Sequence, residues 1–100
     1  MNLESLKSEF SELWSRTVGA YEFVFKMPSQ GAYDACVGRV AKRPELAMDA
    51  MRALCRDAIV SHSASELDAV FAARPGLPAT LANDILKVAA EEEAADVKKL

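Results

Sequence analysis

Apolar residues follow a helical period along most of the chain and a strand period in one stretch near the N-terminus. Residues 2–10 carry apolar side chains at i, i+3 and i+7, which predicts a short helix. In residues 12–26, aromatic and β-branched side chains alternate with polar ones around Gly19 and Ala20. Because a glycine in the first turn position is typical of a type II′ turn, this stretch predicts an antiparallel β-hairpin.

The predicted hairpin has one strongly aromatic face. A two-residue turn sets the register and brings three pairs of side chains to that face: Val18 with Tyr21, Arg16 with Phe23, and Trp14 with Phe25. The opposite face is expected to suit solvent and carries Ser15, Thr17, Glu22, Val24 and Lys26. A lone hairpin is marginal in water, so helices or a partner must cover the aromatic face. We favour the domain's own helices. Arg16 is expected either to stack on Phe23 or Trp14 or to extend to the rim.

A second helix is expected to begin after Ser29, whose hydroxyl can cap the first turn. Apolar residues follow at helical spacing: Ala32, Tyr33, Cys36, Val37 and Val40. Gly31 and Gly38 each weaken a helix by about 1 kcal/mol relative to alanine. We interpret both glycines as positions of close packing between helices.

The third predicted helix starts near Pro44, which suits a first turn, and stops near Ser61. Its polar residues form one narrow stripe: Glu45, Asp49, Arg52 and Arg56. The remaining positions are mainly apolar, and we interpret Met48 and Met51 as core residues. A helix with so narrow a polar stripe is surrounded on its other sides, so it is expected at the centre of the domain.

Two further helices and a tail complete the predicted order. Ser63 and Glu66 have the spacing of a capping box, which predicts the start of a fourth helix that ends before Pro75. His62 precedes it as an exposed spacer. The fifth helix starts at a proline corner and turns these residues inward: Leu77, Leu81, Ile85, Val88 and Ala89. Residues 91–100 lose the apolar stripe and are expected to form a charged, frayed tail.

The predicted fold is therefore α+β and mainly helical, with four to five helices and one small antiparallel hairpin near residues 12–26. Residues 1–90 form a single compact domain in this prediction. The alternative is an all-α bundle in which residues 12–26 are irregular. The predicted core gathers around the third helix and comprises Leu46, Leu54, Ile59, Leu67, Phe71, Leu81 and Ile85.

Composition narrows the classes of partner. The chain has 100 residues, of which 51% are hydrophobic and 27% charged, with a net charge of -3. Neither a nucleic acid nor an anionic membrane is an expected partner, because each needs a concentrated basic surface. No apolar run approaches the roughly 20 residues that span a bilayer, and the N-terminus lacks a signal-peptide pattern. We expect a cytoplasmic protein.

Candidate chemistry is sparse. Cys36 and Cys55 are expected to be reduced core thiols rather than a disulfide. The chain has a single histidine and no close pair of metal ligands, so we predict neither a metal nor a cofactor. The sequence shows no nucleophile with a matching base and no phosphate-binding glycine motif, so we predict that the chain is not an enzyme.

The corner between the last two predicted helices raises a helix-turn-helix alternative. The second of these helices would offer mainly Asn83 and Lys87 to a DNA groove, beside Asp84. Recognition helices normally bring several donors and phosphate-binding cations. Structural packing is the favoured interpretation, and a small helical DNA-binding or regulatory adaptor protein stays as the alternative function.

Three segments carry a resemblance to a known family: "LKSEF", "VGAYEFVFKMPSQGAYDA" and "RALCRDAIVSHSASELDAVFAARPGLPATLANDILKVA". In this order, over about residues 5–90, the chain resembles the small tail assembly chaperones of long-tailed phages and prophages. It departs from that family's pattern at Ser61 and His62, where a turn with proline and aspartate is more usual.

The resemblance implies a transient interaction protein. Such chaperones bind the phage tape-measure protein, help to recruit the tail-tube protein and are not retained in the finished tail. A homo-oligomer is possible. The expected partner-binding residues are those of the aromatic hairpin face: Trp14, Arg16, Tyr21, Phe23 and Phe25.

Overall fold

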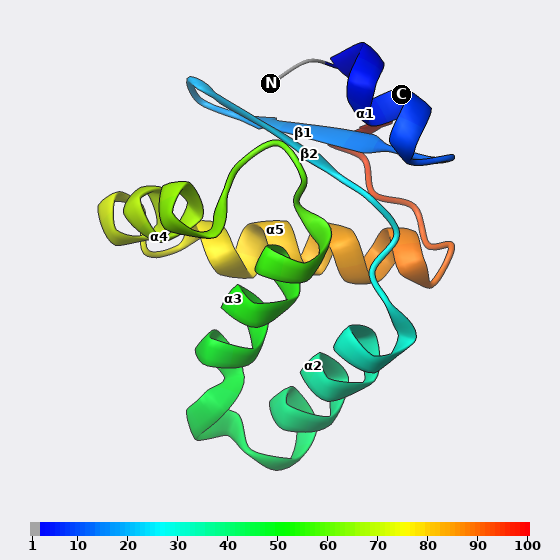
Figure 1. Cartoon of the computed structure of the whole chain (residues 1–100). Helices are drawn as coiled ribbons and strands as arrows, with labels where there is room; N and C mark the ends of the chain where they lie inside the picture. Colours follow the sequence, from blue (N-terminus) through cyan, green and yellow to red (C-terminus); the bar gives the residue numbers. More distant parts are fainter. Residues whose placement is uncertain (1–2) are drawn as a thin grey trace.

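The computed structural model describes residues 3–100, so the start of the first predicted helix at residue 2 lies outside the described residues. The elements are, in order, α1 (Leu3–Glu9), β1 (Trp14–Val18), β2 (Tyr21–Phe25), α2 (Gln30–Lys42), the 3-10 helix η1 (Pro44–Leu46), α3 (Ala47–Ala58), α4 (Ala64–Ala73), α5 (Leu77–Ala89) and β3 (Val97–Lys99) (Figure 1). The prediction of a mainly helical α+β fold is confirmed, and the all-α alternative is wrong.

The hairpin forms in the predicted register. β1 and β2 pair antiparallel, with Trp14 opposite Phe25 and Arg16 opposite Phe23. Gly19 has φ +59°, and the other turn residue, Ala20, is not among the residues with positive φ. This asymmetry agrees with the type II′ turn that the glycine-first order predicts.

Helix α5 lies between the sheet and α3, whereas α1 lies on the other face of the sheet (Figure 1). More of α5 than of α3 is buried: Leu77, Pro78, Leu81, Ala82, Asp84 and Ile85, against Ala50, Leu54, Cys55 and Ala58. The prediction that the third helix is the central one is therefore wrong. Its narrow polar stripe is real, but α5 is enclosed from both sides.

The segment after α3 runs along the outer edge of β2. The backbone N–H of Lys26 donates to Ala58 O at 2.9 Å, and that of Val60 donates to Val24 O at 2.9 Å. The third helix thus ends at Ala58, before the predicted stop. Val24 and Ser15 are 1% and 8% exposed, so the prediction that the second hairpin face suits solvent is wrong for both.

The C-terminal segment does not fray as predicted. Strand β3 pairs antiparallel with β1, which gives a three-stranded sheet in the order β2-β1-β3. The hydrophobic pattern of the sequence does not predict this strand, because the strand is short and rich in lysine. Its position depends on the open edge of β1, which supplies the backbone partners.

The predicted core is confirmed except for Leu46, which is half-buried in η1 at the far end of the α2–α3 pair. The largest side chains with almost no exposure come from the hairpin and from three helices: Phe23, Phe25, Leu54, Leu67, Leu81 and Ile85. Met51 packs against this core, but Met48 is 37% exposed, so its assignment to the core is wrong.

Two predicted helix caps are present. The Ser29 hydroxyl accepts from Ala32 N at 3.2 Å at the start of α2. At the start of α4, the Ser63 hydroxyl accepts from Glu66 N at 3.2 Å, and the Glu66 carboxylate accepts from Ser63 N at 2.9 Å. Each bond satisfies a backbone N–H that the first turn leaves without an intrahelical partner.

The glycines of α2 do not mark close packing. A Cβ added at Gly31 or Gly38 would meet no atom within 4 Å. The prediction of close helix contact at these positions is therefore wrong. Both glycines weaken α2 without a packing gain.

Candidate functional site

The aromatic hairpin face, predicted as a partner-binding surface, lies in the hydrophobic core. Trp14, Phe23 and Phe25 are 9%, 0% and 1% exposed. Trp14 stacks on Phe25 with ring centroids 5.9 Å apart, and Tyr21 stacks on Phe23 at the same separation. Tyr21 is half-buried. The favoured interpretation, that the protein's own helices cover this face, is therefore confirmed for the three buried rings, and these rings are not available to a partner.

Arg16 forms an ion pair instead of the two predicted arrangements. Its Nη1 lies 2.7 Å from Asp84 Oδ2 of α5 and 3.6 Å from Asp96 Oδ2 of the C-terminal segment. Burial raises the pKa of Asp84 above its ordinary value, although Arg16 acts in the opposite direction. Arg16 thus joins β1 to α5 and leaves little of its charge for a ligand. Asp84 carries no local signal in the sequence because its partner is far away in the chain.

The two cysteines are free and buried, as predicted. Burial raises the pKa of the Cys36 thiol, and it raises the pKa of Cys55 to about 12, with the neighbouring Cys36 acting in the same direction. A thiol with so high a pKa stays protonated at neutral pH. Because the thiolate is the nucleophile, Cys55 is poorly suited to catalysis.

His62 is half-buried rather than an exposed spacer, which corrects that prediction. Its Nδ1 lies 2.7 Å from the Ser61 hydroxyl, and its ring lies 5.0 Å from that of Phe23. The same hydroxyl accepts from Val24 N at 3.0 Å. No carboxylate hydrogen-bonds to His62 within residues 3–100, so the pair lacks the group that orients a catalytic base. The Ser61 hydroxyl and the His62 ring instead hold the connection between α3 and α4 against β2.

Neither metal chemistry nor a membrane span has a structural candidate in the described part of the chain. Among residues 3–100, no three histidine, cysteine or acidic side chains are grouped so that they could hold a metal ion. In the same range no helix combines the length and apolarity needed to cross a bilayer.

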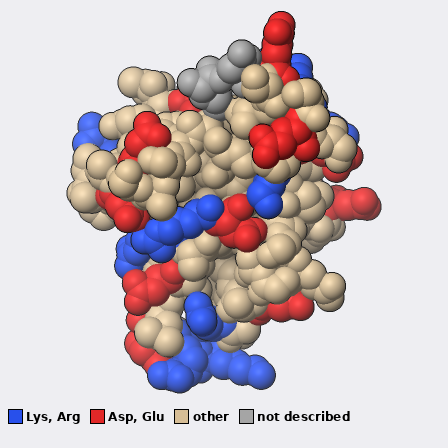
Figure 2. Space-filling view, viewed as in Figure 1, with Lys and Arg blue, Asp and Glu red and all other residues tan. Residues whose placement is uncertain are grey.

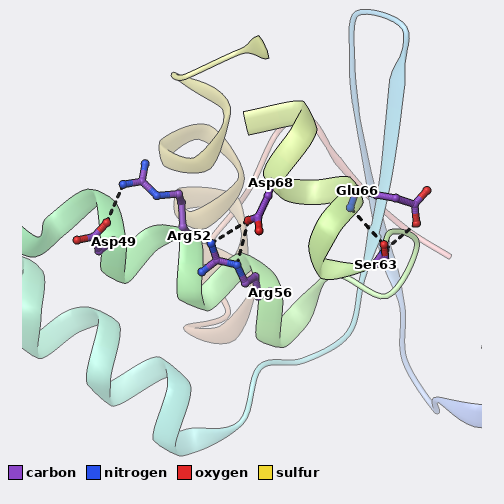
Figure 3. A network of polar contacts seen from close by, with 6 residues as sticks. All are labelled: Asp49, Arg52, Arg56, Ser63, Glu66 and Asp68. Atoms are coloured by element: carbon purple, nitrogen blue, oxygen red, sulfur yellow. Dashed lines mark hydrogen bonds and ion pairs between the residues drawn. The ribbon is translucent and has the colours of Figure 1, made fainter. Parts of the chain in front are cut away.

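The two arginines of α3 form ion pairs with acidic neighbours. Arg52 pairs with Asp49 at 2.7 Å, and Arg56 reaches Asp68 of α4 at 2.8 Å (Figure 3). Figure 3 also shows the capping box of Ser63 and Glu66 next to this link. The Arg56–Asp68 pair links α4 to α3, and both pairs reduce the positive charge that this face offers to an anion.

The most distinctive exposed apolar surface lies on α2. We define the α2 stripe as Tyr33, Val37 and Val40, which recur at i, i+4 and i+7 and so share one side of the helix. Val37 and Val40 are 42% and 36% exposed, and Tyr33 is half-buried. Val40 is near the end of α2 and Met48 lies exposed near the start of α3, so the short connection between the two helices puts both at the same end of the pair.

Unpaired cationic side chains lie at the C-terminal end of α2, within the described part of the chain. Arg39 and Lys42 occupy the last turn of α2, are exposed and have no ion-pair partner in the described part of the chain. Arg43 follows them and pairs with Glu45 at 2.7 Å. Figure 2 shows lysine and arginine atoms gathered at the lower end of the molecule, over the α2–α3 connection. The sequence does not predict this surface, because the helical spacing of the α2 stripe equally fits a buried face.

These features define a small, mainly helical α+β protein that presents an apolar helix surface beside free cations. The chain belongs to the DUF6848 family, described as a domain of unknown function, whose model matches residues 9–98. A comparison with curated proteins gives no match.

A solved structure shares the fold. It is described as the structure of uncharacterised protein rbstp2171 from Bacillus stearothermophilus, with a TM-score of 0.76 and 23% sequence identity. The match covers 94% of this chain and 97% of that one. At this identity the likeness establishes the fold alone.

Proposed function

We propose that this protein is a tail assembly chaperone of a long-tailed phage or prophage, which acts in the bacterial cytoplasm. Its client is the tape-measure protein, and it helps to recruit the tail-tube protein. The proposal takes the activity from the resemblance of residues 5–90 to that chaperone family. It places the contact with the client on the α2 stripe rather than on the aromatic hairpin.

The observation that carries this placement is the exposure of Val37 and Val40 on an otherwise well-packed fold. Apolar burial is favourable in proportion to area and is not directional, so a short apolar stripe can cover helices of varied sequence. An amphipathic client helix would lie along α2 with its own apolar residues at helical spacing. Such a contact is small, which suits a chaperone that must release its client.

The free cations define the expected polarity of the client helix. Arg39 and Lys42 lie beside the stripe at the C-terminal end of α2. Acidic side chains that flank the apolar residues of the client would meet these cations, whereas basic ones would be repelled. Electrostatic complementarity of this kind contributes mainly to specificity and to the rate of association.

The experiment is co-purification with the tape-measure protein encoded in the same phage or prophage genome. The double variant Val37→Ser/Val40→Ser should lose the client and stay folded with only a small change in melting temperature, because both side chains are already partly exposed. The matched control is Leu3→Ser/Met27→Ser, which removes two side chains of 37% and 40% exposure outside the α2 stripe. The control should retain the client.

Three outcomes contradict the proposal. Wild-type protein that fails to retain the tape-measure protein removes the chaperone function. Equal retention by both double variants removes α2 as the contact surface. Salt-sensitive retention on DNA, with none on the tape-measure protein, favours the DNA-binding alternative, in which phosphate contacts weaken as counterions are added.

A further inference from the structure

The C-terminal segment, defined as residues 91–100, is held to the rest of the protein mainly by strand pairing and ion pairs, with little apolar packing. Only Ala94 and Val97 are half-buried, and the other side chains are exposed. A hollow of about 360 Å³ remains beside it, lined in part by Trp14, Val88 and Val97. The segment therefore covers the hairpin without packing densely on it, and little apolar burial opposes its release.

The turn that joins this segment to α5 is strained. Glu92 N donates to Lys87 O at 2.8 Å, and Glu91 has φ 58°, a pattern in which helices usually place glycine. Residues 91–93 are all glutamate and follow the C-terminal end of α5, where the helix dipole is negative. The positive φ of Glu91 and the negative charges of residues 91–93 therefore both destabilise the turn that keeps this segment on its own chain.

Beyond the turn, the segment pairs with β1 in one defined register. The β3 pairing places Lys98 opposite Ser15, and Leu100 N donates to Leu13 O at 2.9 Å. Lys99 Nζ lies 3.3 Å from Glu12 Oε1 and 5.8 Å from the centre of the Trp14 ring. Each of these contacts joins the segment to residues 12–16, and none requires that both belong to one chain.

We propose that the C-terminal segment is an exchangeable strand, which leaves β1 of its own chain and pairs with β1 of a second copy. Release exposes the backbone groups of β1, because β1 is the middle strand of the sheet. An unpaired strand edge is a template for another strand. The same segment from a second copy fits it in every contact described above, and exchange of an identical element is a low-cost route to a dimer. The exchange does not depend on the proposed chaperone activity.

A disulfide between two different full-length variants tests the exchange. Ser15 and Lys98 are opposite in the register and line one surface hollow. Ser15→Cys protein is mixed with Lys98→Cys protein at high concentration and oxidised gently. A covalent heterodimer that links positions 15 and 98 is expected, because neither variant alone can form this disulfide within one chain. Cys36 and Cys55 are buried and do not compete.

Two controls make the result decisive. The single chain with both Ser15→Cys and Lys98→Cys should form the intramolecular disulfide at low concentration, which verifies that the geometry permits the bond. Ala72→Cys mixed with Lys98→Cys reports random collision, because Ala72 is exposed on α4 and does not line the hollow that Ser15 and Lys98 share. Exchange predicts a heterodimer yield several-fold above this control. A yield equal to the control overturns the proposal.

The turn supplies a second, independent readout. Glu91→Gly relieves the positive φ and should lower the heterodimer yield by favouring the closed monomer. Glu91→Pro cannot adopt a positive φ and should raise the yield. Yields that do not change, or that change in the opposite directions, contradict the role assigned to the turn.

Discussion

The β1–β2 hairpin and helix α2 are both rich in apolar side chains, but the protein uses them differently. Phe23 and Phe25 of the hairpin are 0% and 1% exposed, whereas Val37 and Val40 of α2 are 42% and 36% exposed. The hairpin is covered by α5 on one face, and both of its edges are paired, by β3 and by the segment after α3. Helix α2 packs mainly on α3 and η1. Whether an apolar side chain stays exposed to a partner therefore depends on which elements pack against it, and not on its hydrophobicity alone.

The largest expected effect separates these two regions by stability. Phe23→Ala should destabilise the protein by about 3–5 kcal/mol, since it removes a fully buried ring and leaves a cavity. Val37→Ala should change stability by less than about 0.5 kcal/mol, because the side chain is already solvated. Urea unfolding followed by Trp14 fluorescence measures both. Similar losses for the two variants would contradict the division into core and surface.

A smaller effect concerns the polar link between hairpin and α5. Asp84→Ala should cost about 1–3 kcal/mol at neutral pH, because Arg16 is left without its hydrogen-bond acceptor in a partly buried site. Urea unfolding at neutral pH measures this loss. The exposed pair of Lys99 and Glu12 provides the control, and Glu12→Gln should have little effect.

The pH dependence of Asp84→Asn, which removes the charge but keeps an acceptor for Arg16, sharpens this prediction. Burial raises the pKa of Asp84, so the folded state binds this proton more tightly than the unfolded state does. The contribution of this carboxyl to stability is therefore greatest below the ordinary aspartate pKa and falls as pH rises through the raised value. The wild-type profile minus that of Asp84→Asn should show this fall. A difference that rises with pH would mean that Arg16 outweighs burial.

Loss of the α4 cap should have a moderate effect. Ser63→Ala should cost about 1 kcal/mol, because the N–H of Glu66 loses its acceptor. Hydrogen bonds from Ser63 lower the pKa of Glu66, so the stability that Glu66 adds is present at neutral pH and is lost as pH falls through its lowered pKa. Thermal unfolding measures the change. Ser65→Ala is the matched control in the same turn, and an equal loss there would contradict the assignment.

The smallest stability effect has the opposite sign and belongs to α2. Gly38→Ala should stabilise the protein by about 0.5–1 kcal/mol, because an added Cβ meets no atom within 4 Å and the helix gains propensity. Gly19→Ala should destabilise it instead, because Gly19 has φ +59°. Chemical denaturation compares the two. A loss of stability at position 38 would restore the packing interpretation of this glycine.

Local patterns in the sequence predict much of this fold. Gly19 and Ala20, with alternating aromatic residues on either side, set the hairpin register, and Ser63 with Glu66 sets the start of α4. Each signal lies within a few residues of the structure that it determines. The hydrophobic period likewise predicts the helices, although the end of the third helix is moved by the pairing of Val60 with Val24.

Long-range contacts account for what the sequence did not predict. Arg16 and Asp84 lie in different elements, and β3 acquires strand structure only on the edge of β1. The candidate surface on α2 was missed for a related reason. The spacing of Val37 and Val40 predicts that they share a helix face, but only the positions of the other helices show that nothing in residues 3–100 covers them fully.

The most direct test of the account is to map the client contact by amide NMR on the full chain bound to the tape-measure protein. Binding of the client on α2 predicts shift changes and line broadening concentrated in residues 30–42 and at Met48, with the amides of Tyr21 to Phe25 unchanged. Changes concentrated in the hairpin, with α2 unaffected, would contradict the assignment of α2 as the surface that binds the client.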